Sequence, residues 1–114
     1  MNNMDSTRQS KIAKLIQKEL ADIFLQDGIP FYHCMITVTQ TKVTPDLSSA
    51  RSYLSIFNAE NKNEIIKTIR RNTKDIRFRL AQKVKHQLRI IPQLEFFIDD
   101  SLDYLENIEN LLKS

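Results

Sequence analysis

Cysteine, glycine, proline and tryptophan are scarce in this sequence, which has one Cys, one Gly, three Pro and no Trp among 114 residues. A single cysteine, Cys34, excludes an intrachain disulfide. No apolar run approaches the roughly 20 residues that span a bilayer, and residues 1–18 lack the apolar stretch of a signal peptide. With no Pro/Gly-rich linker to divide it, the chain is expected to form one domain over residues 1–114, in the cytoplasm and without a membrane partner.

Groups for catalysis or metal binding are also few. His33 and His86 are the only histidines, whereas a metal site needs three or four convergent ligands. Asp99 and Asp100 are adjacent at a predicted strand end, where neighbouring side chains point to opposite faces, so their expected role is to cap the following helix. We therefore expect no metal, no cofactor, no small-molecule substrate and no enzymatic activity, with Cys34 as a buried thiol at the start of a strand.

Positive charge is concentrated in one segment of the chain. Residues 67–89 contain nine Lys and Arg residues against one acidic residue, Asp75, a net charge of +8. Residues 90–114 contain one lysine and six acidic residues, a net charge of −5, and the charges of residues 1–66 cancel, which leaves +3 for the chain. We call residues 67–89 the basic block. Such a block favours nucleic acid as the binding partner.

Hydrophobic periodicity and β-branched residues predict a mixture of helices and strands. The expected helices cover residues 7–25, about 62–69, 75–88 and 101–114, and the expected strands cover residues 35–43, 50–57 and 94–98. Ser6 or Thr7 would cap the first helix, with residues 1–6 flexible, and Ser101 would cap the acidic last helix. The first two strands should pair antiparallel, whereas periodicity leaves open whether residues 70–74 form a turn, a kink or continuous helix. The order α-β-β-α-α-β plus a C-terminal helix predicts an α+β domain with its helices packed on one face of a three-stranded sheet.

Several stretches, taken together, resemble one known family. They read IQKEL over residues 16–20, ITVT…VTPDLSSA…YLSI over residues 36–56, IR..L…LRIIPQLEF over residues 76–96 and DDS over residues 99–101. In this order and spacing, over about residues 8–112, they are similar to the ribosome-binding factor A family, whose fold is a type II KH-like domain. One departure is that Asn72-Thr73-Lys74 stands where the family usually has Ala-x-Gly. Because glycine tolerates left-handed backbone angles better than Thr or Lys, the kink is expected to be milder or shifted to Asn72.

The resemblance implies a non-catalytic ribosome assembly factor. Such proteins bind the small (30S) ribosomal subunit near the decoding region during late maturation, leave the mature subunit and matter most at low temperature. For this chain the resemblance implies the small subunit and 16S rRNA as partners, with roles in rRNA processing and cold adaptation. We also expect a monomer.

The basic block and a lysine stripe on the first helix supply the candidate RNA-binding residues. Phosphate contacts need cations and no catalytic group, and Arg also stacks on exposed bases. The main candidates are Arg70, Arg71, Lys74 and Arg77, the second are Lys67, Lys83, Lys85 and Arg89, and the third are Lys11, Lys14 and Lys18. Backbone N–H groups at the start of the third helix can also face a phosphate. The alternative is a solvated helical face or, for Arg77 and Arg89, pairing with Glu95 or Asp99.

Other interpretations stay open. Aromatic residues can form base-stacking platforms, although core packing is the more common role. The candidates are Phe31, Tyr32, Tyr53, Phe57, Phe78 and Phe97, of which Phe78 lies off the apolar stripe of its helix and is the best exposed candidate. Other functions are an adaptor that docks the basic block on an acidic protein, and a nonspecific DNA-binding protein. The acidic C-terminal segment either folds back on the basic block and weakens nonspecific binding or contributes only to the core.

Overall fold

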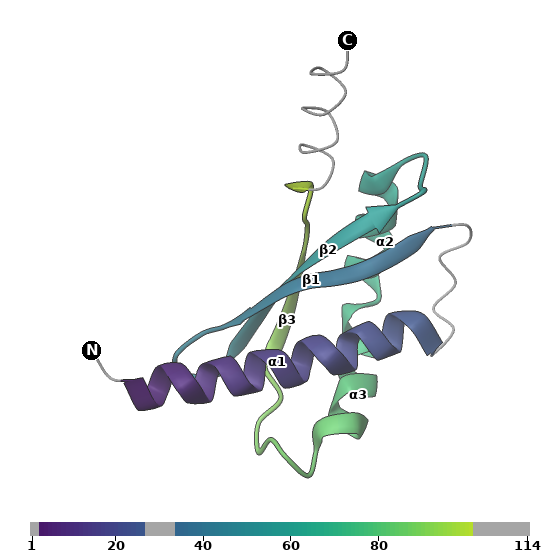
Figure 1. The fold of residues 1–114 in the computed structure, drawn as a ribbon. Helices are drawn as coiled ribbons and strands as arrows, with labels where there is room; N and C mark the ends of the chain where they lie inside the picture. Colours follow the sequence, from purple (N-terminus) through teal and green to yellow (C-terminus); the bar gives the residue numbers. More distant parts are fainter. Residues whose placement is uncertain (1–2, 27–33, 102–114) are drawn as a thin grey trace.

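The computed structural model describes residues 3–26 and 34–101 of the chain (Figure 1). In this part of the chain six elements follow in the order α1 (Asn3–Gln26), β1 (Met35–Val43), β2 (Ser49–Phe57), α2 (Lys62–Arg71), α3 (Thr73–Val84) and β3 (Gln93–Ile98). The α+β class and the order of these elements predicted from the sequence are confirmed. The predicted C-terminal helix, Ser101 apart, lies outside the described residues.

Two predicted helix boundaries are wrong. α1 begins at Asn3, so Ser6 and Thr7 lie within the helix instead of capping it; residues 3–6 contain no proline or glycine to stop it. α3 ends at Val84, and the following residues close a turn in which the Leu88 N–H donates to Val84 O at 2.9 Å. Periodicity extended this helix too far because Leu88 still packs against the core after the helix has ended.

The three strands form one sheet in the order β1-β2-β3, in which β1 pairs antiparallel and β3 pairs parallel with β2. Val38 lies opposite Leu54, and Phe96 follows the same side-chain alternation on β3, so these three residues share one face of the sheet. All three are buried, and the helices pack on this face. α1 runs across the strands, whereas α2 and α3 lie end to end beside β3 (Figure 1).

The core fixes how the two short helices are held against the sheet. Its fully buried helical residues are Ile16, Leu20 and Ile23 of α1, Ile69 of α2, and Ile76, Leu80 and Val84 of α3. Phe96 of β3 lies among them, with its ring 6.0 Å from the ring of Phe24 in an edge-to-face contact. Burial of these stripes, rather than helix propensity, holds α2 and α3 in place, because helices of this length are marginal alone in water.

Side chains from the helices bind carbonyl groups along both outer edges of the sheet. Gln9 and Gln17 of α1 donate to Val43 O at 3.1 Å and Val38 O at 3.2 Å on β1. Arg70 of α2 donates to the Phe96 carbonyl on β3. Occupying carbonyls of an edge strand reduces its tendency to pair with another chain.

The turn between β1 and β2 is held by one carboxylate. Asp46 Oδ1 accepts hydrogen bonds from the Ser48 hydroxyl at 2.8 Å, the Thr44 hydroxyl at 2.8 Å and the Ser48 backbone N–H at 3.1 Å. These bonds, led by that of the Ser48 side chain, lower the pKa of Asp46. The turn also places Leu47 at a left-handed φ of 62°, so the Asp46 contacts stabilise a backbone conformation that leucine resists.

We expect Asp46→Ala to destabilise the fold at neutral pH and to lose this effect in acid. Because the pKa of Asp46 is lower in the folded chain, its contribution is fully present above the unfolded carboxyl pKa of about 3.9 and disappears as pH falls through the folded value. Urea unfolding of both proteins across this range measures the difference. Asp46→Asn keeps the acceptor oxygen without the charge, so the stability difference between Asp46→Asn and Asp46→Ala should not change with pH over this range. An Asp46→Ala difference from the wild type that is as large in strong acid as at neutral pH would contradict the assignment.

Candidate nucleic-acid interface

A single residue, Asn72, separates α2 from α3. Its backbone angles are φ −100° and ψ 11°, and among the described residues other than glycine only Leu47 and Asn58 have positive φ. Asn72 bonds back to α2, with its side-chain amide donating to Thr68 O at 2.8 Å and its backbone N–H to Ile69 O at 3.0 Å. The break therefore requires no left-handed residue, which explains how the chain forms it without the glycine that the resemblance led us to expect there.

Introducing the missing glycine, by Lys74→Gly, is expected to reduce stability by about 0.5–1 kcal/mol. Lys74 is the second residue of α3, where the backbone is helical, so glycine costs backbone entropy and no left-handed angle offsets that cost. Thermal unfolding would measure the change, with Lys74→Ala, a helix-favouring substitution, as the control. An increase in stability on Lys74→Gly would show that the break at Asn72 is strained.

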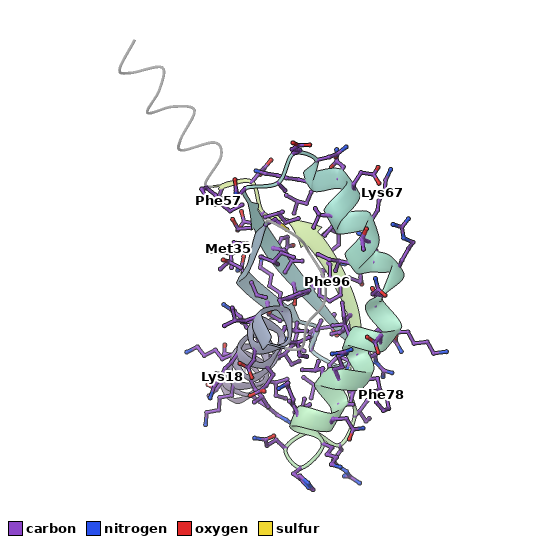
Figure 2. All side chains as sticks on the ribbon, turned by 90° about the vertical axis from the view of Figure 1, so that its right-hand side faces the viewer. Lys18, Met35, Phe57, Lys67, Phe78 and Phe96 are labelled. Atoms are coloured by element: carbon purple, nitrogen blue, oxygen red, sulfur yellow. The ribbon has the colours of Figure 1, made fainter. Side chains whose placement is uncertain are left out.

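The outward sides of α2 and α3 form a cationic face with one aromatic residue within it. Because Ile66, Ile69, Ile76 and Leu80 are buried, residues on the opposite side of each helix point into solvent. We call five of these exposed residues the α2–α3 face: Lys67, Arg71, Lys74, Phe78 and Lys85. Figure 2 shows Lys67 and Phe78 on the same side of the molecule. Lys74 and Lys85 have no bonded partner among the described residues.

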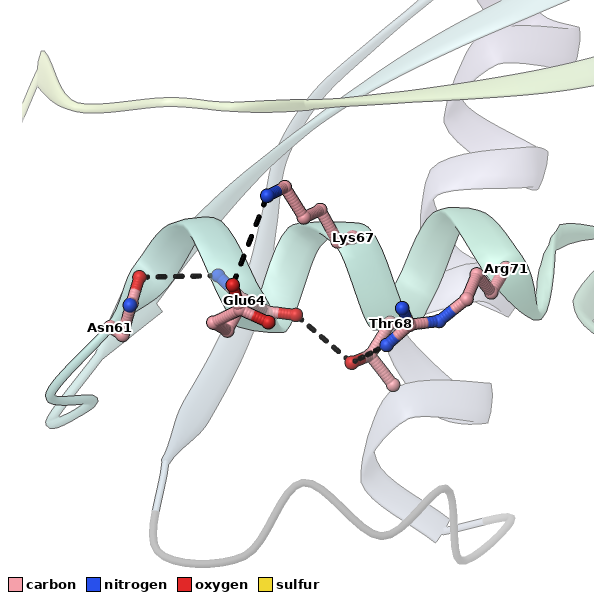
Figure 3. A network of polar contacts seen from close by, with 5 residues as sticks. All are labelled: Asn61, Glu64, Lys67, Thr68 and Arg71. Carbon is pink, nitrogen blue, oxygen red and sulfur yellow. Dashed lines mark hydrogen bonds and ion pairs between the residues drawn. The ribbon is translucent and has the colours of Figure 1, made fainter.

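The α2 part of this face is ordered by a short polar network (Figure 3). Asn61 caps α2 by accepting from the Glu64 N–H at 3.2 Å. The Thr68 hydroxyl donates to Glu64 O at 2.9 Å and accepts from Arg71 Nη2 at 3.1 Å. Lys67 lies 3.8 Å from Glu64, but both side chains are more than 60% exposed, so this pair contributes little to stability. Lys67 and Arg71 therefore keep accessible cationic groups.

Two of the main candidates, Arg70 and Arg77, bind the backbone of the protein. Arg70 Nε and Nη2 donate to Phe96 O at 3.1 and 2.8 Å. Arg77 Nε donates to Pro92 O at 3.0 Å, and its Nη2 donates to Ile91 O. The pairing expected for Arg77 is thus made with carbonyl groups instead of a carboxylate. The Arg70 guanidinium holds β3 itself and that of Arg77 holds the segment before it, so at most part of each is left for a phosphate.

Two further cations of the basic block form ion pairs. Lys83 lies 3.3 Å from Asp22 and joins α3 to α1. Arg79, 3.1 Å from Asp75, pairs along its own helix. The structure therefore divides the basic block into cations that hold the fold and cations that point outward.

The lysine stripe of α1 is not brought together with the α2–α3 face. Lys11, Lys14 and Lys18 are exposed, and Figure 2 shows Lys18 on the opposite side of the molecule from Lys67. A ligand that contacts one of these surfaces would have to wrap around the domain to contact the other. The stripe and the face are thus two separate candidate surfaces.

The remaining candidates lie elsewhere. Arg89 is exposed beyond the end of α3 and lines an open groove of about 560 Å³ together with Arg8. Cys34 lies just before β1, as predicted, but is half-buried instead of buried, and this burial raises the pKa of its thiol. Within residues 3–26 and 34–101 no group of three potential metal ligands occurs, and no helix combines the length and apolarity needed to cross a membrane.

The aromatic candidates have different environments. Tyr53 and Phe97 stack on the sheet face away from the helices, with ring centres 5.6 Å apart. Lys42 lies 6.0 Å from the Tyr53 ring and Arg70 lies 5.8 Å from the Phe97 ring, so a cation is placed against each ring of the pair. In contrast, Phe57 and Phe78 are each 63% exposed. Phe57 is therefore not a core residue, and the expected exposure of Phe78 is confirmed. Phe31 and Tyr32 lie outside the described residues.

These features define a small α+β domain of the type II KH-like class with a cationic helical face. The family model of ribosome-binding factor A matches residues 8–112. The chain belongs to the ribosome-binding factor A family, as its sequence motifs indicated.

Relatives and solved structures agree with this assignment. The chain is 44% identical over 110 residues to ribosome-binding factor A of Cytophaga hutchinsonii, covering 96% of this chain and 83% of the relative. It is 46% identical over 113 residues to that of Flavobacterium johnsoniae, covering 96% and 85%. The crystal structure of ribosome-binding factor A from Thermus thermophilus superposes with a TM-score of 0.67 at 21% identity, over 79% of this chain and 94% of that one. A homology model of the Thermus thermophilus protein, fitted into a cryo-EM map of a 30S complex, gives a TM-score of 0.66 at 20% identity, over 77% and 91%.

Proposed function

We propose that this chain is a non-catalytic cytoplasmic factor that binds the small ribosomal subunit through 16S rRNA and assists its late maturation. Family membership supports the partner, since the Thermus thermophilus homologue was fitted into a map of a 30S complex. The observation that supports RNA as the contacted component is the α2–α3 face. Its lysines at positions 74 and 85 have no partner among the described residues, so they can neutralise phosphates without breaking contacts that hold the fold.

The proposed mechanism requires binding and no covalent chemistry. Lys67, Arg71, Lys74 and Lys85 would each neutralise a phosphate and release condensed counterions, so affinity should fall steeply as salt rises. Holding an rRNA segment during its final rearrangement would promote processing of the 16S precursor. Because mispaired RNA helices open more slowly in the cold, the effect should be largest at low temperature.

The proposed function is tested by co-sedimenting the purified full chain with immature small subunits, mature small subunits and whole ribosomes at low and moderate salt. We expect salt-sensitive association with small subunits and a preference for immature ones. Absence of association with every particle would overturn the proposal. If an acidic protein competes for the chain as well as rRNA does, the result would favour the adaptor interpretation. Equal affinity for duplex DNA and for the subunit would indicate a nonspecific DNA-binding protein.

A further inference from the structure

We propose that Phe78 is a stacking platform for one unpaired base of an RNA strand bound along the α2–α3 face. This inference rests on the proposed function and deepens it. The Phe78 side chain is 63% exposed on the outward side of α3 (Figure 2). A large apolar ring left in water gives up the stabilisation that burial provides. Nothing in the described fold covers Phe78, so its ring face is available to a ligand.

The surroundings of Phe78 favour RNA over a protein partner. Lys74 lies one helical turn before it and Lys85 two turns after it, and both are exposed without a partner among the described residues. Asp75, a carboxylate on the same helix, is held by Arg79 at 3.1 Å. An apolar protein surface that covered Phe78 would have to desolvate these lysines, which is unfavourable. A single-stranded nucleic acid supplies both a base for the ring and phosphates for the lysines.

The spacing along α3 fits this mode of binding. At about 1.5 Å of rise per residue, Lys74 and Phe78 are about 6 Å apart along the helix axis, and Phe78 and Lys85 are about 10 Å apart. Lys74 and Lys85 therefore lie on either side of Phe78 along the helix axis. A base resting on the ring would place its own phosphates within reach of the two flexible lysine side chains.

The other exposed or stacked rings are less suited to this role. Phe97 and Tyr53 stack on one another, and Arg70 and Lys42 approach the same rings. Phe57 is as exposed as Phe78, but Met35, which is 64% exposed, lies opposite it on β1. Phe57 is therefore a matched control, since it is the same residue type with the same exposure outside the α2–α3 face.

Two kinds of variant test the proposal on the full chain. The chain contains no tryptophan, so Phe78→Trp and Phe57→Trp each introduce a single fluorescent indole. We expect a single-stranded oligoribonucleotide to quench the indole of Phe78→Trp and to leave that of Phe57→Trp unchanged. Phe78→Leu, which keeps apolar bulk without a ring, should weaken RNA binding about 5- to 150-fold, whereas Phe78→Tyr and Phe57→Leu should bind like the wild type.

The outcomes separate the proposal from the function on which it rests. Wild-type affinity of Phe78→Leu for RNA and for small subunits would overturn stacking while leaving the proposed function intact. Loss of subunit association by Phe78→Leu with unchanged affinity for RNA would also overturn it, because the ring would then contact ribosomal protein. If the wild type itself fails to associate with any ribosomal particle, the proposed function fails first, independently of Phe78.

Discussion

A variant carrying Lys67→Glu, Lys74→Glu and Lys85→Glu is expected to lose at least about 100-fold in affinity for small subunits while remaining folded. Three lost phosphate contacts at about 1 kcal/mol each remove roughly 3 kcal/mol of binding free energy, and the new carboxylates repel phosphates. None of the three lysines holds one element against another, so the free energy of unfolding should change little. Affinity measured against salt concentration should also show a shallower slope than for the wild type.

The chain offers a control of matched charge for this variant. Lys11→Glu, Lys14→Glu and Lys18→Glu make the same number and kind of reversals on α1. Either triple variant takes the formal net charge from +3 to −3, because each reversal subtracts two. Equal losses of affinity would mean that net charge alone governs binding, and a loss confined to the α1 variant would move the interface to that helix.

Helical geometry explains why the sequence identified the basic block but not how its cations divide. Arg70 follows the buried Ile69, and Arg77 follows the buried Ile76, so each lies about 100° around its helix from the core and at the border of the sheet. Lys74, two residues before Ile76, lies about 160° around α3 from it and so points further from the core than Arg77 does. The angular position could be read from the sequence. The carbonyl groups that Arg70 and Arg77 bind could not, because they belong to β3 and the segment before it.

The fold was more predictable than the interface because its signals are local. Alternation of β-branched residues located β1 and β2, and the buried stripe of Ile76, Leu80 and Val84 located α3. The parallel pairing of β3 with β2 has no local signal, because α2 and α3 lie between the two strands in the chain. The break at Asn72 was left open, since the apolar stripes of α2 and α3 allow both a turn and a kink.

Phe96→Ala should be among the most destabilising substitutions in the domain, at about 3–5 kcal/mol. Phe96 is 2% exposed, packs edge-to-face on Phe24 of α1 and has its carbonyl held by Arg70 of α2. The substitution would open a cavity where α1 and α2 meet β3. Since domains of this size have about 5–15 kcal/mol of stability in total, much of the variant should be unfolded near physiological temperature.

Urea unfolding would measure this effect, and Phe57→Ala is its control, because truncation of a 63% exposed phenylalanine should change stability by no more than about 0.5 kcal/mol. β3 holds α2 and α3 in position, so RNA affinity in Phe96→Ala should fall in proportion to the fraction folded and recover when lower temperature restores folding. Unimpaired stability in Phe96→Ala would mean that β3 does not hold the α2–α3 face. Lost affinity in a fully folded Phe96→Ala protein would instead place Phe96, or the Arg70 bound to its carbonyl, in contact with RNA.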